Sequence, residues 1–381
     1  MAVACLALGA AAAAVLVLPQ AAAAQQFFLA FGDSITFGVG DGLNAGGYPA
    51  RLQTLLDRRG ISSVVQNAGQ SGETTAQGLT RIDLALPPRA GTLLLMEGTN
   101  DINVKISTET IATNLDLIAR KAESQGYKVV HATVPPRLPA ASVDGENQQT
   151  AGLAAAIREL AWRQGRSLAD PFEVFFYYTP DAFSHDYLGG ADNLHPNAAG
   201  YDILAATFAD VLSGADKVPP VTGLVYPPPA RTDVPANTEI DVDLYDFGKG
   251  IDLRATTLSI NGQAVSPSVT GNSSKLQMVF RPQTPLKGLV AVHLTSQDLA
   301  SPPNVIDRDV TDFLVAGTVF LPGDINRDGR VDGADLILLA LAFGAHRFDD
   351  RYNLAADLNG DGIVDGLDLA ILASNFGKSS F

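Results

Sequence analysis

The first half of the sequence alternates short apolar runs with longer amphipathic ones, and this alternation restricts the fold more than any other feature. Short apolar runs bounded by turn residues are typical of buried strands. Longer segments with apolar residues at helical spacing, ending at a glycine, are typical of helices. This order predicts an α/β fold, a parallel sheet with helices on both faces. The predicted strands are 26–31, 63–68, 92–97 and 128–134, and the clearest helices are 48–60 and 109–126.

Polar residues follow several of these strands, at the edge where parallel sheets bind their ligands. Ser34 follows the first strand, in the sequence FGDSITFG. A serine hydroxyl needs a base to remove its proton before it can act as a nucleophile. The segment DNLHPNAAGY offers His195, with Asp192 three residues before it. The carboxylate can hold one ring nitrogen while the other faces Ser34, as in a catalytic triad.

Acyl transfer also needs hydrogen-bond donors for the oxyanion of its tetrahedral intermediate. The candidates are the N–H groups of Ser34 and of Gly72 in NAGQSGETT, and the side-chain amide of Asn100 in EGTND. With DNLH, these motifs resemble, in order, those of the SGNH or GDSL family of esterases and lipases. The resemblance implies a flavodoxin-like three-layer sandwich with Ser34 as nucleophile, His195 as base and Asp192 as its partner. It also implies an oxyanion hole of Ser34, Gly72 and Asn100, and no cofactor for catalysis.

Other polar residues near these motifs have structural explanations. Asp33 is expected to hydrogen-bond the backbone around its turn. Glu97 is interpreted as a carboxylate that stabilises a loop, and His131 as a side chain packed in the sheet. His185 is a reserve candidate for the base, but only His195 has an acid three residues earlier and a Pro-Asn helix start after it.

The pattern changes after residue 214. A proline-rich segment, 215–238, indicates a linker (215–220) and the entry to a new domain. The following strands alternate polar and apolar residues, with turns between them and no helix. We expect an Ig-like β-sandwich at 221–317, with no reactive site. Its predicted strands are 239–246, 256–262, 275–282 and 290–298.

The last sixty residues contain an internal repeat. Asp324–Gly344 aligns with Asp357–Gly377, and 13 of 21 positions are identical. Each copy carries oxygen ligands at positions 1, 3, 5, 9 and 12 of a loop with glycine at position 6, which is the spacing of an EF-hand calcium loop whose position 7 contributes its carbonyl. Two Ca²⁺ ions are predicted. Their ligands would be Asp324, Asn326, Asp328, Arg330, Asp332 and Asp335 in one loop and Asp357, Asn359, Asp361, Ile363, Asp365 and Asp368 in the other.

Each loop holds four aspartates, so metal binding and folding should be coupled. A helix follows each loop, none of matching strength precedes it, and position 12 is aspartate, where helix–loop–helix sensors use glutamate. These features resemble a type I dockerin over about 322–378, within a domain predicted at 318–381. The resemblance implies a cohesin-bearing scaffold protein as partner. Family members recognise cohesin partly through hydroxyls at positions 10 and 11, which here are Gly333–Ala334 and Gly366–Leu367. The alternative is a calcium-stabilised tail that binds no partner.

Residues 1–24 are almost wholly apolar and end in small residues, which predicts a secretory signal peptide and an extracellular protein. No basic residue precedes the apolar run, so translation could start upstream of Met1. No second segment is long and apolar enough to span a membrane. The only cysteine, Cys5, lies in the predicted signal, which excludes disulfides from the mature protein. With 26 basic and 41 acidic residues the net charge is −15, which disfavours nucleic acid as a partner.

The leading functional hypothesis is a secreted ester hydrolase that removes O-acetyl groups from plant polysaccharides, because dockerins accompany polysaccharide-degrading enzymes. The hydrolase motifs themselves, which resemble the family over about 26–214, specify only acyl transfer to water. A lipase, lysophospholipase or thioesterase would use the same residues. A different class of function, a non-catalytic calcium-binding adhesion protein, predicts the loss of at least one of Ser34, Asn100, Asp192 and His195, and all four are present. Loops 36–47 and 135–149 are expected to shape the pocket.

Overall fold

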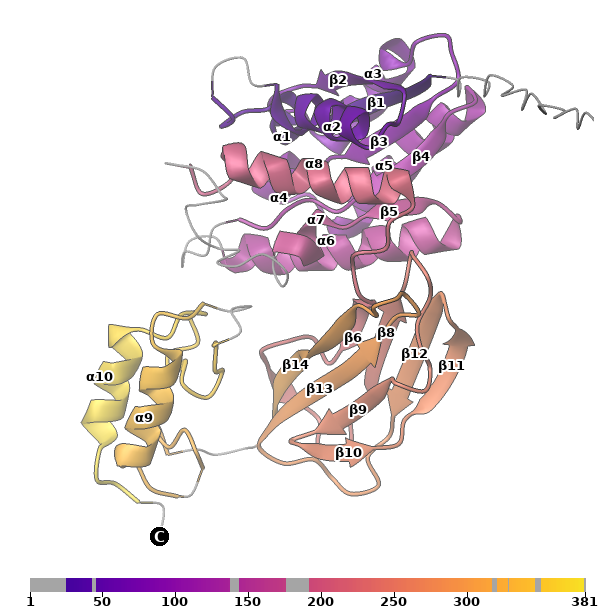
Figure 1. The fold of residues 1–381 in the computed structure, drawn as a ribbon. Helices are drawn as coiled ribbons and strands as arrows, with labels where there is room; N and C mark the ends of the chain where they lie inside the picture. The colour runs from indigo at the N-terminus through magenta and orange to yellow at the C-terminus, as the bar shows by residue number, and fades with distance from the viewer. Residues whose placement is uncertain are drawn as a thin grey trace, which may run out of the picture.

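The computed structural model describes residues 25–42, 46–137, 144–175, 192–316, 321–327, 329–346 and 351–379. The predicted signal peptide, His185 and Asp328 lie outside these ranges. The described residues form three separate hydrophobic cores, at 27–209, 234–315 and 325–372. The ribbon in Figure 1 shows the three corresponding groups of helices and strands. We refer to the corresponding parts of the chain as the α/β unit, the β-sheet unit and the C-terminal unit.

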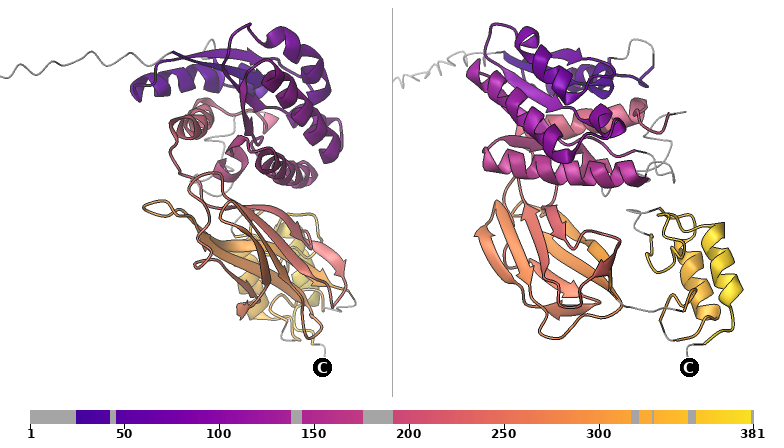
Figure 2. Two further views of the ribbon diagram at one scale, coloured as in Figure 1. Left: turned by 90° about the vertical axis from the view of Figure 1, so that its right-hand side faces the viewer. Right: turned by 180° about the vertical axis from the view of Figure 1, so that it is seen from behind.

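The α/β unit is built on five parallel strands in the order β2-β1-β3-β4-β5. This is the strand order of flavodoxin-like doubly wound sheets, so the expected α/β fold with a parallel sheet is confirmed. Helix α2 packs against α8 on one face, while α3, α5 and α6 pack side by side on the other (Figures 1 and 2). The strands are β1 Gln26–Gly32, β2 Ser63–Gly69, β3 Thr92–Met96, β4 Lys128–Ala132 and β5 Ser167–Ala169, and the helices are α1 Ser34–Phe37, α2 Gly47–Arg58, α3 Thr75–Ala85, α4 Thr99–Asn103, α5 Thr108–Ser124, α6 Asp144–Arg163, α7 Pro171–Glu173 and α8 Ala198–Ser213.

Burial explains which strands the sequence pattern could reveal. Central strand β1 pairs on both sides, and every residue after Gln26 in it is buried, so it is continuously apolar. Strand β5 was not predicted. It has three residues, Ser167–Ala169, and is too short to produce an apolar run.

The β-sheet unit contains two sheets, β10-β9-β13-β14-β7 and β11-β12-β8-β6, whose inward residues share one core. Strand β13 alternates buried and half-buried residues along its whole length, which is the pattern that predicted it. Five further strands were not predicted. Two of them, β6 and β7, lie within the proline-rich segment, whose prolines occur outside the strands, and the other three are β10, β11 and β14. The strands are β6 Val221–Tyr226, β7 Arg231–Val234, β8 Ile240–Tyr245, β9 Thr257–Ile260, β10 Gln263–Val265, β11 Ser268–Asn272, β12 Lys275–Phe280, β13 Leu289–Gln297 and β14 Val305–Val315.

Buried ion pairs attach the β-sheet unit to the α/β unit. Arg158 of α6 pairs with Asp170 at 2.7 Å and with Glu173 at 3.1 Å, and donates to the carbonyl oxygen of Thr222 in β6 at 2.6 Å. Arg308 of β14 approaches the other oxygen of Glu173 at 2.7 Å. Because Arg158 and Glu173 are almost fully buried, the two units share charged groups that water cannot solvate.

Aromatic contacts extend this interface. The indole N–H of Trp162 donates to Ser274 Oγ at 3.2 Å, and Lys275 Nζ lies 4.8 Å from the centroid of the Trp162 ring. Lys275 also pairs with Glu159 at 2.9 Å, and the Tyr245 hydroxyl donates to the same carboxylate. Helix α6 therefore packs against the sheet of the α/β unit on one side and the β-sheet unit on the other.

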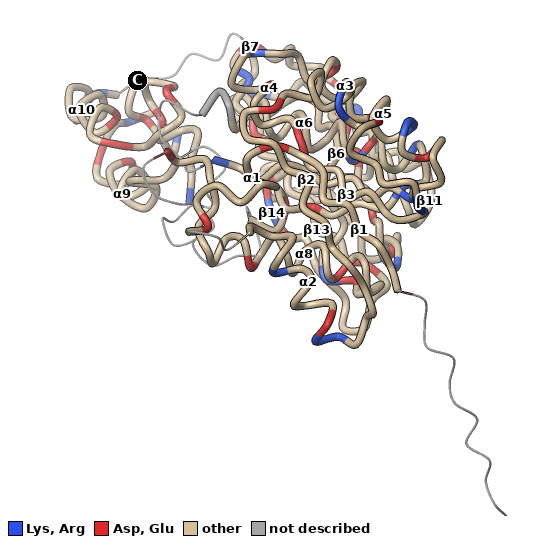
Figure 3. The backbone as a smooth tube through the Cα atoms, turned by 90° about the horizontal axis from the view of Figure 1, so that it is seen from above, with Lys and Arg blue, Asp and Glu red and all other residues tan. Residues whose placement is uncertain are grey.

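The C-terminal unit contains helix α9 (Gly333–Ala342) and helix α10 (Gly366–Asn375), each directly after one copy of the acidic loop. Figure 3 shows acidic residues along these loops. A helix was expected after each loop, and α9 begins at Gly333, within the last three positions of the loop, because Asp332 caps it with a capping box formed with Asp335. None of the helices in the described ranges has a stretch long and apolar enough to cross a bilayer.

Candidate active site

The sheet register brings together the loops that follow its three neighbouring strands. Gly32, the last residue of β1, pairs with Gly69 of β2 and with Met96 of β3. Ser34, Gly72 and Asn100 follow those three residues by two, three and four positions. All three therefore lie at the carboxyl edge of the sheet. Between β1 and β3 the direction in which successive strands are added to the sheet reverses, and doubly wound folds bind ligands at this point.

The turn after β1 is tightly packed. A β-carbon on Gly32 would lie 1.9 Å from the carbonyl oxygen of Met96, so only glycine allows β1 to approach β3 here. Asp33 caps α1 by accepting the N–H of Ile35 at 2.9 Å, as expected. Burial, partly offset by Ile35 N–H, the Thr99 hydroxyl and the neighbouring His195, raises the pKa of Asp33 to about 6.

Ser34, His195 and Asp192 form one hydrogen-bonded chain. His195 Nε2 lies 2.8 Å from Ser34 Oγ, and His195 Nδ1 lies 2.5 Å from Asp192 Oδ2. The other carboxylate oxygen of Asp192 accepts the N–H groups of Leu194 and His195, both at 3.1 Å. Burial opposes ionisation of Asp192, but the hydrogen bonds from His195 and Leu194 outweigh it and lower its pKa. An ionised Asp192 holds the His195 ring with Nε2 toward the serine, the geometry that general-base activation requires.

The His195 segment is held in place by residues that the motifs did not reveal. Gly40 has φ +91°, and a β-carbon on it would lie 2.6 Å from the carbonyl oxygen of Pro196. The buried Tyr201 of α8 donates to the carbonyl oxygen of Val39 at 2.6 Å. Asn197 caps α8 by accepting the N–H of Gly200 at 3.1 Å, as the Pro-Asn helix start predicted. No motif in the sequence points to the contact between Gly40 and Pro196.

The oxyanion candidates have suitable conformations. The side chain of Asn100 donates one N–H to the carbonyl oxygen of Glu73 at 2.9 Å, which fixes the plane of its amide. Gly72 has φ +79°, which a residue with a side chain adopts only under strain, and a β-carbon there would meet no atom within 4 Å. Gly98, with φ +132°, turns the chain from β3 into α4, of which Asn100 is the second residue.

The interpretations of the remaining polar residues also have counterparts in the structure. His131 is fully buried in β4, and burial with the nearby Arg166 lowers its pKa to about 3, so it is a neutral core residue. Glu97 is fully buried, and burial with the neighbouring carboxylates of Glu73 and Asp33 raises its pKa well above the usual value. Loops 36–47 and 135–149, expected to shape the pocket, each include residues outside the described ranges.

The two acidic loops of the C-terminal unit have matching hydrogen bonds. Asp335 accepts the N–H groups of Ile325, Asn326 and Asp332, at 2.7, 3.0 and 2.8 Å. Asp368 accepts those of the equivalent residues in the second loop, at 2.7, 3.1 and 2.8 Å. Among the described residues, no three carboxylates of these loops lie within 4.8 Å of one another. In each loop, the carboxylate at position 12 thus holds the first and last parts of the loop together by accepting backbone N–H groups from both.

Comparison with protein families matches residues 30–203 to the GDSL-like Lipase/Acylhydrolase family and residues 322–376 to the Dockerin type I domain. Esterase TesA of Pseudomonas aeruginosa is 36% identical over 118 residues, and the match spans 31% of this chain and 58% of that protein. The chain thus covers less than two thirds of that relative's length.

Two solved structures match about half of the chain. The lipase/acylhydrolase from Enterococcus faecalis is 23% identical with a TM-score of 0.44, and the match covers 50% of this chain and 96% of that one. An acetylxylan esterase from Geobacillus stearothermophilus is 22% identical with a TM-score of 0.40, covering 48% and 92%. Residues 30–203 of this chain thus hold a domain that matches the GDSL-like Lipase/Acylhydrolase family, and residues 322–376 hold one that matches the Dockerin type I domain.

Proposed function

We propose that this protein is a carboxylic ester hydrolase whose nucleophile is Ser34. The observation that carries the proposal is the alignment of Ser34 Oγ, the His195 ring and Asp192, with contacts of 2.8 and 2.5 Å across 161 residues of sequence. The match of residues 30–203 to the lipase/acylhydrolase family supports the same reaction.

In the proposed mechanism, Ser34 Oγ attacks the ester carbonyl carbon while His195 Nε2 takes the hydroxyl proton. The carbonyl oxygen becomes an oxyanion, stabilised by the N–H groups of Ser34 and Gly72 and by the Asn100 amide. His195 then gives its proton to the leaving alcohol as the C–O bond breaks. A water molecule, deprotonated by His195, attacks the acyl carbon on Ser34. The bond between that carbon and Ser34 Oγ breaks, the acid is released, and His195 returns the proton to Oγ.

The proposed substrates are O-acetyl groups on plant polysaccharides. The support is the presence of a dockerin type I domain in the same chain, since the family resemblance links such domains to polysaccharide-degrading enzymes. A long-chain lipid ester or a thioester could react at the same three side chains, so substrate comparison must separate these possibilities.

We further propose that the C-terminal unit binds two Ca²⁺ ions and docks on a cohesin-bearing scaffold protein outside the cell. The donors are the paired loops 324–335 and 357–368. Asp335 is fully buried, and Asp324 is half-buried with an Oδ1 atom that has no hydrogen-bond partner among the described residues. Repeat-related apolar side chains, Leu336 with Leu369 and Phe343 with Phe376, are more than a third exposed and could contact a partner.

The proposed domain layout is a signal peptide at 1–24, a hydrolase domain at 25–214, a linker at 215–220, an Ig-like β-sandwich at 221–317 and a dockerin domain at 318–381. This layout is supported by the three hydrophobic cores, which lie within the proposed hydrolase, β-sandwich and dockerin segments, respectively.

The test is hydrolysis of short-chain and long-chain chromogenic esters, compared with acetate release from acetylated xylan. Ser34→Ala should retain the fold and lose activity by about 10⁴-fold or more, whereas Ser124→Ala, an exposed serine on α5, should behave as the parent. Equal turnover by Ser34→Ala and the parent would exclude the proposed nucleophile. Activity confined to the chromogenic esters would keep the reaction class and remove the carbohydrate assignment. Intact binding to a scaffold without any hydrolysis would favour an adhesion protein.

A further inference from the structure

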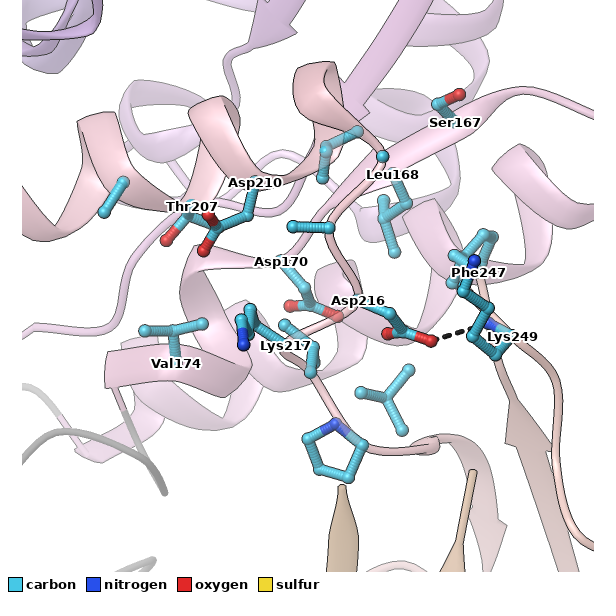
Figure 4. Close-up of a pocket in the computed structure, with 18 of the residues that line it drawn as sticks. Ser167, Leu168, Asp170, Val174, Thr207, Asp210, Asp216, Lys217, Phe247 and Lys249 are labelled. Atoms are coloured by element: carbon cyan, nitrogen blue, oxygen red, sulfur yellow. Dashed lines mark hydrogen bonds between the residues drawn. The ribbon is translucent and has the colours of Figure 1, made fainter. Parts of the chain in front are cut away.

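Three aspartates from separate segments meet where the α/β unit joins the β-sheet unit. Asp216 lies between α8 and β6, Asp246 follows β8, and Asp298 follows β13. One carboxylate oxygen from each lies within 4.8 Å of those from the other two. Figure 4 shows Asp216 beside a cavity of about 450 Å³, which is lined by α8, β5 and loop 247–249. This cluster is separate from the Ser34 site and from the C-terminal loops.

Backbone N–H groups hold each carboxylate in a fixed orientation. Asp246 Oδ1 accepts the N–H groups of Gly248 and Gly250, at 2.8 and 2.7 Å. Asp298 Oδ1 accepts those of Ala300 and Asn304, at 3.0 and 2.8 Å. Hydrogen bonds of this kind orient the ligands of metal sites.

Asp216 is fixed in the same way, from the other side of the junction. Its Oδ2 accepts the N–H of Lys249 at 2.6 Å (Figure 4). A β-carbon on Gly248 would lie 2.2 Å from the same oxygen, so glycine at 248 is what allows the Asp216 carboxylate to reach the cluster. The side-chain amide of Asn304 donates to the Asp216 carbonyl oxygen at 3.3 Å and to Asp298 Oδ2 at 2.5 Å.

The cluster has an excess of buried negative charge. Asp246 is 7% exposed, and its Oδ2 is buried without a hydrogen-bond partner. In the part of the chain that the structure describes, no basic nitrogen forms an ion pair with Asp216, Asp246 or Asp298. The ammonium groups of Lys249 and Lys217 only act on Asp216 from a distance and do not prevent burial from raising its pKa. Burial, only partly offset by the two glycine N–H groups, raises the pKa of Asp246 to about 6. A buried carboxylate with an unused oxygen is stabilised either by a proton or by a bound cation.

We infer that Asp216, Asp246 and Asp298 form a Ca²⁺ site that fastens the segment after α8 to two loops of the β-sheet unit. The spacing agrees with oxygens that share one ion at 2.3–2.6 Å. A donor set made only of oxygens favours a hard cation over zinc or copper. Calcium is favoured over magnesium because Mg²⁺ retains most of its water and seldom occupies a cage of protein ligands.

The first test measures calcium binding by the full chain. Asp324→Ala with Asp357→Ala removes the first ligand of each C-terminal loop and serves as the background, in which calorimetric titration with CaCl₂ should show one remaining site. In that background, Asp246→Asn should weaken binding at least about tenfold. Gly248→Ala should do the same although it changes no charge, because its methyl group displaces the Asp216 carboxylate. Asp233→Asn, which alters an exposed aspartate of the same unit, should leave the affinity unchanged.

The second test separates a metal site from a cluster that is merely hydrogen-bonded. In chelator, Asp246→Asn should raise the unfolding temperature of the background, because it removes a buried charge. In Ca²⁺ the background should instead have the higher unfolding temperature, because the ion stabilises the background and not the Asp246→Asn variant. The inference is overturned if Asp246→Asn raises the unfolding temperature by the same amount in chelator and in Ca²⁺. It is also overturned if the background binds no calcium. Equal affinity for MgCl₂ overturns the assignment to calcium.

Discussion

The carbonyl oxygen of Pro196 occupies the position that a side chain on Gly40 would need, 2.6 Å from the ideal β-carbon. Because Pro196 directly follows His195, this contact connects the loop after α1 to the proposed general base. Gly40 also has φ +91°, so it is the residue at which the loop can both turn and approach the histidine segment.

Gly40→Ala is therefore expected to displace His195 and lower kcat/KM for a short-chain ester by about 10- to 100-fold, because small displacements of catalytic groups have effects of this size. Gly42→Ala is the matched control, since Gly42 has φ +85° but no atom lies within 4 Å of its ideal β-carbon. Both variants place alanine at a positive φ and are strained for that reason. Only Gly40→Ala also brings a methyl group into the carbonyl oxygen of Pro196. Equal activities of the two variants would contradict the positioning role.

Asp192→Asn should lower kcat by about 10- to 1000-fold, less than Ser34→Ala, because an amide no longer stabilises the imidazolium form of His195. The side chain of Asp192 is 52% exposed, so water can replace part of its effect. Steady-state kinetics with a short-chain ester check this. An unchanged kcat would mean that another group orients His195.

Asn100→Ala and Asn100→Asp should each lower kcat by about 100- to 1000-fold and leave KM nearly unchanged, because a donor aimed at the oxyanion acts mainly in the transition state. Asn100→Asp preserves the shape of the side chain but removes its N–H groups. Thermal unfolding of both variants serves as the control for the lost bond to Glu73. A rise in KM with unchanged kcat would assign Asn100 to substrate binding instead.

Asp33 should make stability depend on pH. Its pKa is about 6 when folded and 3.8 in the reference state, so between these values the folded chain holds a proton that the unfolded chain has released. The free energy of unfolding should therefore fall as pH rises from about 4 to 6, by roughly 3 kcal/mol. Asp33→Asn removes this pH dependence, because an amide does not titrate, and it keeps a side-chain oxygen that can accept the N–H of Ile35.

The measurement is urea unfolding of the parent, Asp33→Asn and the exposed Asp57→Asn between pH 4 and 8. The difference between Asp33→Asn and the parent should grow with pH through this window and level off above it. Asp57→Asn should follow the parent throughout. A constant difference between Asp33→Asn and the parent would disagree with a raised pKa for Asp33.

Removal of calcium should unfold the C-terminal unit, because each proposed loop concentrates four aspartates. Circular dichroism should show the loss of helices α9 and α10 in excess chelator, and proteolysis should then cleave within 321–379. Asp335→Ala should produce the same susceptibility in calcium, whereas Ser374→Ala, at an exposed position of α10, should not. A unit that remains helical and resistant in chelator would refute the calcium assignment.

Sequence reasoning was most successful where periodicity and burial coincide. In strands such as β1 and β13, the pattern of apolar residues matches the pattern of buried positions. The polar residues that follow β1, β2 and β3 predicted the location of the proposed site. The strands β5 and β10 were missed because three residues are too few to show a period, and β6 and β7 were missed because prolines flank them. Strands β11 and β14 were also missed. Every residue of β11 is exposed, so that strand has no alternation of buried and exposed positions.

The contacts that could not be predicted join residues that are far apart in the sequence and share no motif. Nothing in the sequence around Gly40 shows that Pro196 will lie against it, and Asp216, Asp246 and Asp298 are separated by 30 and 52 residues. An isolated aspartate between turns is ordinary. Only the fold shows that three of them share one buried space.

The ion pairs around Arg158 determine what would follow from shortening the chain. A polypeptide ending at residue 220 would lack the Thr222 carbonyl and the Arg308 guanidinium, and Trp162 would lose its hydroxyl and ammonium neighbours. Glu173 would then depend on Arg158 alone, and an indole would be left facing solvent. We therefore expect the α/β unit, which carries the proposed hydrolase site, to be less stable alone than when it is joined to the β-sheet unit.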